Sequence, residues 1–331
     1  NIMKKLLSII LLTATTMALT SCSNSEKLEV SQIVVDNFNL GTGVNVSHWL
    51  SQSDRRGEER AKQISKKDFD AIAAMGFEHV RLPIDEEQMY DENLNRHDDA
   101  FALMKQAIEW TLENNMNIVI DLHITRAHYF LTENENTLFS DPAAQQHMIE
   151  MWKDLQEFLQ GYPTDRLAYE LLNEAIAPTH EALNELEARL IAAIREKEQD
   201  RFIVVGCDWQ QSVVTMKYLQ VPKNDKNLII SFHYYNPLFI THYGAWWTPM
   251  KDYKDKVEYP GVFNPKPEFY ENLDPKLENQ YRSLTGVWNK DYLLQQIKPC
   301  IDKGKELGLQ VYCGEFGAYP YFIEKEPSLS R

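Results

Sequence analysis

Short, fully apolar runs recur along the chain and alternate with longer segments whose apolar residues lie three or four positions apart. Runs such as Ile118 to Ile120 and Phe202 to Val205 have no polar face, which is typical of parallel strands covered on both sides. The pattern predicts seven strands in this sequence: Gly43 to Ser47, Glu78 to Pro83, Asn117 to His123, Leu167 to Asn173, Phe202 to Cys207, Leu228 to Tyr234 and Gln310 to Phe316.

The segments between these strands carry the period of about 3.6 residues that marks amphipathic helices. Gly76 and Gly308 follow two of the segments, at positions where a helix is expected to end. The clearest apolar stripes are Phe101, Met104, Ile108 and Leu112; Met148, Met151, Trp152, Leu155 and Leu159; and Leu183, Leu186, Leu190 and Ile194.

This regular alternation predicts an α/β fold, a closed parallel (β/α)8 TIM barrel. A doubly wound open sheet is the alternative, but no glycine-rich phosphate loop follows the first strand. A complete barrel has an eighth strand, and the pattern supplies seven. We therefore expect this chain to be truncated at its C-terminus, with the last helix–strand unit or units missing.

One segment interrupts the alternation of predicted strands and helices. Residues 236–289 contain Trp246, Trp247, several tyrosines and six prolines without clear periodicity. Long irregular loops in compact domains usually serve function. In a barrel this loop would rise from the C-terminal face, where active sites are built.

The N-terminal residues have the pattern of an export signal. Lys4 and Lys5 precede an apolar run that is too short to span a bilayer. The tetrapeptide Leu19-Thr20-Ser21-Cys22 resembles a bacterial lipoprotein box, which implies cleavage before Cys22 and lipid on its thiol. The expected organisation is a signal peptide over 1–21, a tether over 22–40 and one catalytic domain over 41–331, exported and lipid-anchored to the bacterial cell envelope, at the outer membrane or the surface.

Composition narrows the classes of partner. The formal net charge is −15, which argues against nucleic acid as a ligand. Beyond Cys22, the cysteines are Cys207, Cys300 and Cys313, and their spacing matches neither a disulfide framework nor a zinc site. Asp121-x-His123 stands alone, with no His-x-His after the first strand, so we expect no metal and no cofactor.

Polar side chains follow the apolar runs at several strand ends. The residues are Arg81, Asp121, His123, Asn173, Glu174, His233, Tyr235 and Glu315. Because the C-terminal ends of barrel strands converge on one pocket, we expect them to lie together. Two carboxyl groups facing one pocket are what glycoside hydrolysis requires, and a separation near ~5 Å corresponds to a retaining enzyme.

The segment from Leu167 to Glu174, Leu-Ala-Tyr-Glu-Leu-Leu-Asn-Glu, resembles the signature of glycoside hydrolase family 5, the large cellulase family. Val80-Arg81-Leu82-Pro83, His123, His233 with Tyr235, and Gly314-Glu315-Phe316-Gly317 match its other motifs in order, and the likeness covers about residues 41–320.

The resemblance implies a role for each matching residue. Glu174 would be the acid/base and Glu315 the nucleophile, kept ionised by Arg81 and a hydrogen bond from Tyr235. Asn173 would hold the substrate 2-hydroxyl, and the two histidines, His123 and His233, would line the cleavage subsite.

Three features depart from the family pattern. Ala175 stands where the family usually has Pro or Val, and residues 124–130 do not follow the common cellulase continuation. The tryptophan that the eighth strand normally brings to the cleavage subsite is missing. Separately, we expect tryptophans at the rim to stack on sugar rings, whereas Trp110 and Trp152 lie on helix stripes and belong to the core. The expected rim residues are Trp49, Trp209, Trp246 and Trp247.

The first hypothesis is therefore a monomeric, retaining endo-β-1,4-glucanase that acts on β-glucan or a related plant polysaccharide and touches the membrane only through its lipid. A β-mannanase, xyloglucanase or β-1,3-glucanase would use the same catalytic residues. From other classes, a non-catalytic glycan-binding lipoprotein is disfavoured because both glutamates are intact, and a solute-binding lipoprotein because the pattern shows neither two α/β lobes nor a hinge.

Overall fold

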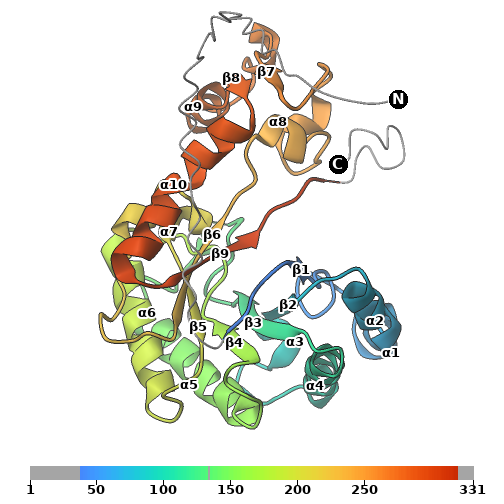
Figure 1. The fold of residues 1–331 in the computed structure, drawn as a ribbon, viewed down its shortest axis with the longest axis vertical. Coiled ribbons are helices and arrows are strands. Elements are labelled where there is room, and N and C mark those ends of the chain that lie inside the picture. Colours follow the sequence, from blue (N-terminus) through green and yellow to red (C-terminus); the bar gives the residue numbers. More distant parts are fainter. Residues whose placement is uncertain (1–37, 133–134, 320–331) are drawn as a thin grey trace, which may run out of the picture. The chain divides into compact units, whose positions relative to one another are not determined.

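The computed structural model describes residues 38–132 and 135–319, and its centre is a seven-stranded parallel sheet (Figure 1). Its strand order, β1-β2-β3-β4-β5-β6-β9, is the chain order. All seven predicted strands are confirmed: β1 (Gly43–Asn45), β2 (His79–Asp85), β3 (Asn117–Ile124), β4 (Leu167–Glu170), β5 (Ile203–Gly206), β6 (Leu228–His233) and β9 (Gln310–Glu315).

The sheet curls into a nearly closed barrel, as predicted. Among the described residues, β9 and β1 share no ladder of backbone hydrogen bonds. A side chain bridges them, because Asn45 Nδ2 donates to the Gly314 carbonyl oxygen at 3.1 Å. The two edge strands are therefore held close enough for the active-site ends of all seven strands to face one another.

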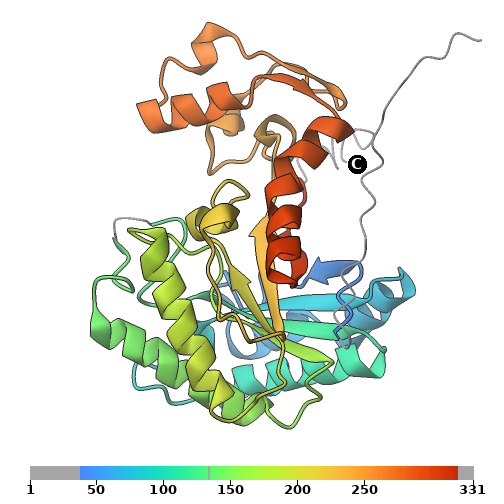
Figure 2. The same cartoon turned by 60° about the vertical axis from the view of Figure 1, so that its left-hand side comes forward.

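Helices cover the outside of the sheet (Figure 2). The stripe from Met148 to Leu159 is buried as expected. Side-chain caps fix the starts of three long helices, with Asp141, Thr179 and Asn289 accepting hydrogen bonds from backbone N–H groups. The helices around the barrel are α1 (Gly57–Gln63), α2 (Lys66–Ala74), α3 (Glu86–Met89), α4 (Asp98–Glu113), α5 (Pro142–Leu159), α6 (His180–Arg195), α7 (Asp208–Gln211), η2 (Met216–Tyr218) and α10 (Lys290–Leu307).

The interior of the barrel has an apolar floor toward the N-terminal ends of the strands. Phe38 and Leu40, each 3% exposed, belong to this cluster although they precede the first strand. The last residues of the expected tether thus pack into the barrel. The floor comprises Phe38, Leu40, Val119, Ala168, Phe202, Val204, Ile229 and Tyr312.

The insertion after β6 is a small folded unit, which corrects the prediction of an irregular loop (orange in Figure 1). A two-stranded antiparallel ribbon and short helices surround their own apolar cluster, which is rich in Phe, Tyr and Trp. These aromatics are irregularly spaced, so neither helical nor strand periodicity reveals the unit. Its elements are α8 (Leu238–Thr241), η3 (Pro249–Asp252), β7 (Gly261–Phe263), η4 (Pro267–Phe269), α9 (Pro275–Ser283) and β8 (Gly286–Trp288).

The expected signal peptide over 1–21 and the lipidation site Cys22 lie outside the described residues. In the part of the chain that the structure describes, none of the helices combines the length and apolar character that a bilayer crossing requires.

Candidate active site

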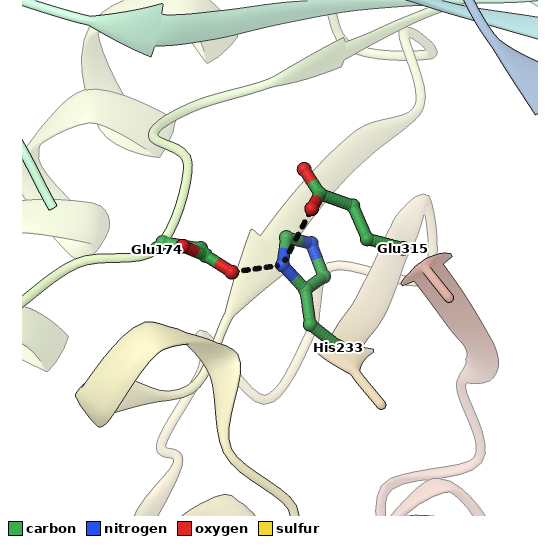
Figure 3. A group of neighbouring side chains, drawn as sticks. All are labelled: Glu174, His233 and Glu315. Carbon is green, nitrogen blue, oxygen red and sulfur yellow. Dashed lines mark hydrogen bonds and ion pairs between the residues drawn. The ribbon is translucent and has the colours of Figure 1, made fainter. Parts of the chain in front are cut away.

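Three predicted side chains meet at the C-terminal ends of the strands. Glu174 follows β4, His233 ends β6 and Glu315 ends β9, and Figure 3 shows the three pointing toward one another. His233 Nδ1 lies 2.8 Å from Glu174 Oε1 and 3.6 Å from Glu315 Oε2. A carboxylate oxygen of each glutamate lies within 4.8 Å of the other. The fold therefore brings together two acids that are far apart in sequence.

Arg81 lies beneath this pair and is fully buried. Its Nη1 donates to Glu315 Oε1 at 2.8 Å, and its Nη2 donates to Asn173 Oδ1 at 2.8 Å. Arg81 also forms a bidentate pair with Glu170, in which Nε donates to Oε2 at 2.6 Å and Nη2 donates to Oε1 at 3.1 Å. Nη2 also forms an ion pair with Asp121 at 3.0 Å. One rigid guanidinium thus orients both the expected nucleophile Glu315 and Asn173, the residue before the expected acid/base.

Glu315 is held in its ionised form. Burial acts to raise the pKa of its carboxyl, but the charges of His233, Arg81 and His123 outweigh it. Tyr235 adds a hydrogen bond, its hydroxyl donating to Glu315 Oε2 at 2.7 Å. The net effect holds the pKa of Glu315 well below its usual range, as a nucleophilic carboxylate requires.

The two predicted histidines differ in their partners. His123 Nδ1 lies 2.7 Å from Asp121 Oδ2, and His233 Nδ1 faces the two glutamates. Burial acts to lower the pKa of each histidine, but neighbouring carboxylates outweigh it and raise both pKa values above normal. The raised pKa values favour the protonated form of both rings, so both place positive charge beside the carboxylates of the pocket.

The structure adds two members that sequence reasoning did not assign a role. Glu170 is completely buried beside Arg81 at the end of β4. Burial raises the pKa of its carboxyl group despite the positive charge of Arg81. Asn45 accepts from Arg81 Nη1 at 3.0 Å and bridges to Gly314. A charged residue inside an apolar strand was the available signal for Glu170, because such a residue is seldom buried without a partner. Asn45 gave no comparable signal.

The four predicted rim tryptophans do not share one environment. The prediction for Trp49 is wrong: it is 0% exposed, and its indole Nε1 donates to the Arg60 carbonyl oxygen at 2.9 Å. The preceding His48 has φ +56° and lies in a bend of the chain, and Trp49 packs in the core. Trp209, Trp246 and Trp247 are 57%, 74% and 44% exposed, and each offers a ring to solvent.

Trp246 and Trp247 line a pocket of about 790 Å³ in the insertion, together with lysine and aspartate side chains. A series of ring contacts leads from this pocket toward the nucleophile. Trp247 and His242 have centroids 6.1 Å apart, and His242 and Tyr235 have centroids 5.5 Å apart. Trp247 is thereby connected to the site through His242, and Trp246 contacts Trp247 with a centroid separation of 5.6 Å.

Glu174, His233 and Glu315 also form the group of side chains, among residues 38–132 and 135–319, whose ligand atoms come close enough to share a metal ion. In the structure these atoms partner one another instead. Family 5 chemistry was expected to need neither metal nor cofactor, and that expectation stays a prediction.

Comparison with known sequences points to the same class of enzyme. The family described as Cellulase (glycosyl hydrolase family 5) matches residues 41–320. Endoglucanase C of Acetivibrio thermocellus is 32% identical over 281 residues, which cover 83% of this chain and 80% of that protein. Cellodextrinase A of Ruminococcus flavefaciens is 29% identical over 280 residues, covering 83% and 75%.

Solved structures agree in fold. Thermotoga maritima Cel5A in complex with mannotriose gives a TM-score of 0.64 at 26% identity, covering 85% of this chain and 80% of that chain. The cellulose synthase subunit Z from Clostridioides difficile gives a TM-score of 0.65 at 23% identity, covering 85% and 81%. The latter likeness concerns the fold alone.

Proposed function

Because this chain belongs to the cellulase family, glycosyl hydrolase family 5, and is a glycoside hydrolase of that family, we propose that it is an endo-acting β-1,4-glucanase that retains anomeric configuration. Glu315 is the nucleophile and Glu174 is the acid/base. The observation that carries this proposal is the meeting of the two carboxylates around His233, with oxygens within 4.8 Å.

The spacing favours retention over inversion. Retaining enzymes hold their carboxyl groups about 5–5.5 Å apart, whereas inverting enzymes leave about 6.5–9.5 Å for a water molecule. One oxygen of each glutamate lies within 4.8 Å of an oxygen of the other, and this close approach fits the retaining arrangement better than the inverting one. It supports direct attack by Glu315 on the anomeric carbon and formation of a covalent glycosyl-enzyme.

The proposed mechanism assigns each of these side chains a step in the reaction. Glu315 attacks as Glu174 gives its proton to the leaving oxygen, and Glu174 then takes a proton from the water that releases the sugar. Asn173 Oδ1 is occupied by Arg81, while its buried Nδ2 has no partner among the described residues. We assign Nδ2 to the 2-hydroxyl of the substrate, where a hydrogen bond strengthens in the transition state.

A β-1,4-glucan is the proposed substrate because the relative with the highest identity given above is named an endoglucanase. Trp209, Trp246 and Trp247 remain our proposed sugar-stacking residues, since flat apolar rings match the C–H faces of sugars. The mannotriose complex of Thermotoga maritima Cel5A keeps a β-mannan in the test panel.

The test is release of reducing ends from a panel of β-glucans, β-mannan, xyloglucan and β-1,3-glucan. We expect the largest rate on β-1,4-glucan, and loss of that rate in Glu174→Gln and Glu315→Gln. Removal of one member of a catalytic unit costs several orders of magnitude, about 10⁴-fold or more. Binding without turnover, unchanged in Glu315→Gln, would instead support a glycan-binding lipoprotein.

We also propose that the protein is exported, lipid-anchored at Cys22 and monomeric. The support for export and for the lipid anchor is the sequence of residues 1–22 alone. Metabolic labelling with a fatty-acid analogue should mark the wild-type protein and leave Cys22→Ala unlabelled. Equal labelling of both would reject the anchor, and sedimentation of the detergent-extracted protein would test the oligomeric state.

A further inference from the structure

The turn that follows β5 has an uncommon backbone. Trp209, Gln210 and Gln211 have φ angles of +56°, +59° and +54°, so three consecutive residues other than glycine are left-handed. Each left-handed residue costs roughly 1–2 kcal/mol. Such conformations persist only where surrounding contacts enforce them, and they cluster at functional sites.

The contacts that enforce this backbone run to the segment after β4, which contains the acid/base Glu174. Gln210 N–H donates to the Ala175 carbonyl oxygen at 3.1 Å, and Ala177 N–H donates to Asp208 Oδ1 at 3.0 Å. The other oxygen of Asp208 lies 2.8 Å from His180 Nδ1. The turn and the segment that carries Glu174 therefore form one interlocked unit.

Gln211 makes the contact nearest to the chemistry. It is 1% exposed, and its Oε1 accepts the backbone N–H of Glu174 at 2.9 Å. Its Nε2 donates to Ser231 Oγ at 2.9 Å and lies 3.4 Å from Glu170 Oε1. Glu174 itself has φ +46°. A buried side chain anchored on β6 thus holds the backbone of the acid/base in a conformation that it would not prefer alone.

The strand before the turn makes room for this side chain. A Cβ atom at Gly206 would lie 2.6 Å from Gln211 Cγ and 2.8 Å from Gln211 Cδ, far inside contact distance. Gly206 ends β5, so an alanine there would press on Gln211 from the barrel wall. Position 206 therefore offers a way to displace the Gln211 side chain without altering it.

From this geometry we propose that Gln211 is a positioning residue that sets Glu174 for proton transfer to the leaving group. It touches neither the substrate nor the carboxyl group of Glu174. It fixes the main chain from which that carboxyl projects toward His233 and Glu315. The inference rests on the proposed function, because it needs Glu174 to be the acid.

The test compares aryl β-cellobiosides that differ only in the acidity of the phenol released. A nitro-substituted phenol departs without a proton, whereas an unsubstituted phenol needs one from Glu174. General acid catalysis is worth about 10²–10⁴-fold, so partial misplacement in Gln211→Met should lower kcat/KM for the phenyl substrate about tenfold or more. For the nitro-substituted substrate, kcat/KM should change by less than about twofold.

Gln210→Met is the matched control, because it is the neighbouring glutamine in the same left-handed turn and contacts the backbone of Phe130 instead of Glu174. It should preserve the wild-type ratio of the two kcat/KM values. Gly206→Ala and Ser231→Ala should reproduce the selective loss. They remain decisive if Gln211→Met does not fold, as judged by thermal melting and circular dichroism.

The outcomes separate the two levels of the proposal. Hydrolysis of neither cellobioside by the wild-type protein would overturn the proposed function. Wild-type hydrolysis of both, with equal losses on both in every folded variant that disturbs Gln211, would overturn the positioning role and leave the function standing. Loss confined to the substrate that needs a proton supports both.

Discussion

Replacement of Arg81 by methionine tests the electrostatic design of the site. The guanidinium is fully buried and lies against three carboxylates, those of Glu170, Asp121 and Glu315. Methionine preserves much of the volume and removes the charge. Breaking a buried ion pair by deleting one partner costs about 3–5 kcal/mol, so we expect the free energy of unfolding near neutral pH to fall by at least that amount.

The stability of the wild-type protein and that of the variant should change with pH in opposite directions. In the wild-type protein the lowered pKa of Glu315 stabilises the fold above the unfolded pKa of about 4.3, and this stabilisation is lost as the pH falls. In Arg81→Met the same carboxylates stay buried but lose the guanidinium, so their pKa values should rise and the folded state should bind more protons than the unfolded state. Stability of the variant should then rise as the pH falls from about 7 to about 5.

Urea unfolding followed by tryptophan fluorescence at several pH values measures both effects. Arg201→Met is the matched control, because Arg201 is also fully buried and bonds Glu198 at 2.6 Å but precedes β5 at the opposite end of the strand. The control should lose stability while its folded form keeps kcat/KM. Retention of wild-type stability, or of wild-type activity, by Arg81→Met would refute the role given to this network.

Three further substitutions test individual contacts. In Gly314→Ala the new Cβ would lie 3.0 Å from both His233 Nε2 and Ser231 Oγ, so these side chains must give way by a few tenths of an ångström. We expect kcat/KM on cello-oligosaccharides to fall about tenfold or more, and unchanged kinetics would show that the ring position is not critical. Tyr235→Phe removes a hydrogen bond to Glu315 worth about 1.5–3 kcal/mol, so the pKa of Glu315 should rise and the acid limb of the kcat/KM profile should move to higher pH; an unmoved limb would contradict this. Trp49→Ala should destabilise the fold by about 3–5 kcal/mol in a thermal or urea melt, whereas an unchanged melt with a raised KM would restore the rim interpretation.

The barrel was predictable because several strands are apolar runs and β2 to β6 are buried along almost their whole length, a pattern that few other folds produce. The catalytic pair was predictable for a topological reason. Once the strands are parallel and ordered, residues that follow them converge at one end, so Glu174 and Glu315 meet although 140 positions separate them.

Other features depend on tertiary contacts that no local pattern encodes. Trp49 follows a strand as a rim residue would, yet its ring packs in the core and donates to the Arg60 carbonyl oxygen after a bend with a left-handed residue. The left-handed turn at residues 209–211 consists of a tryptophan and two glutamines. None of them is a glycine, asparagine or aspartate, the residues that would indicate a left-handed conformation in a sequence. The insertion folds around irregularly spaced aromatics, and periodicity cannot detect a core of that kind.

The most direct test of the account is identification of the residue that becomes glycosylated. A fluorinated cellobioside with a good leaving group slows the second step and lets the covalent intermediate accumulate, so that digestion and mass spectrometry locate the sugar. We predict the mass increase on the peptide that contains Glu315, and none in Glu315→Gln. A label on the Glu174 peptide, or inactivation with no label on either, would contradict the assignment of nucleophile and acid/base.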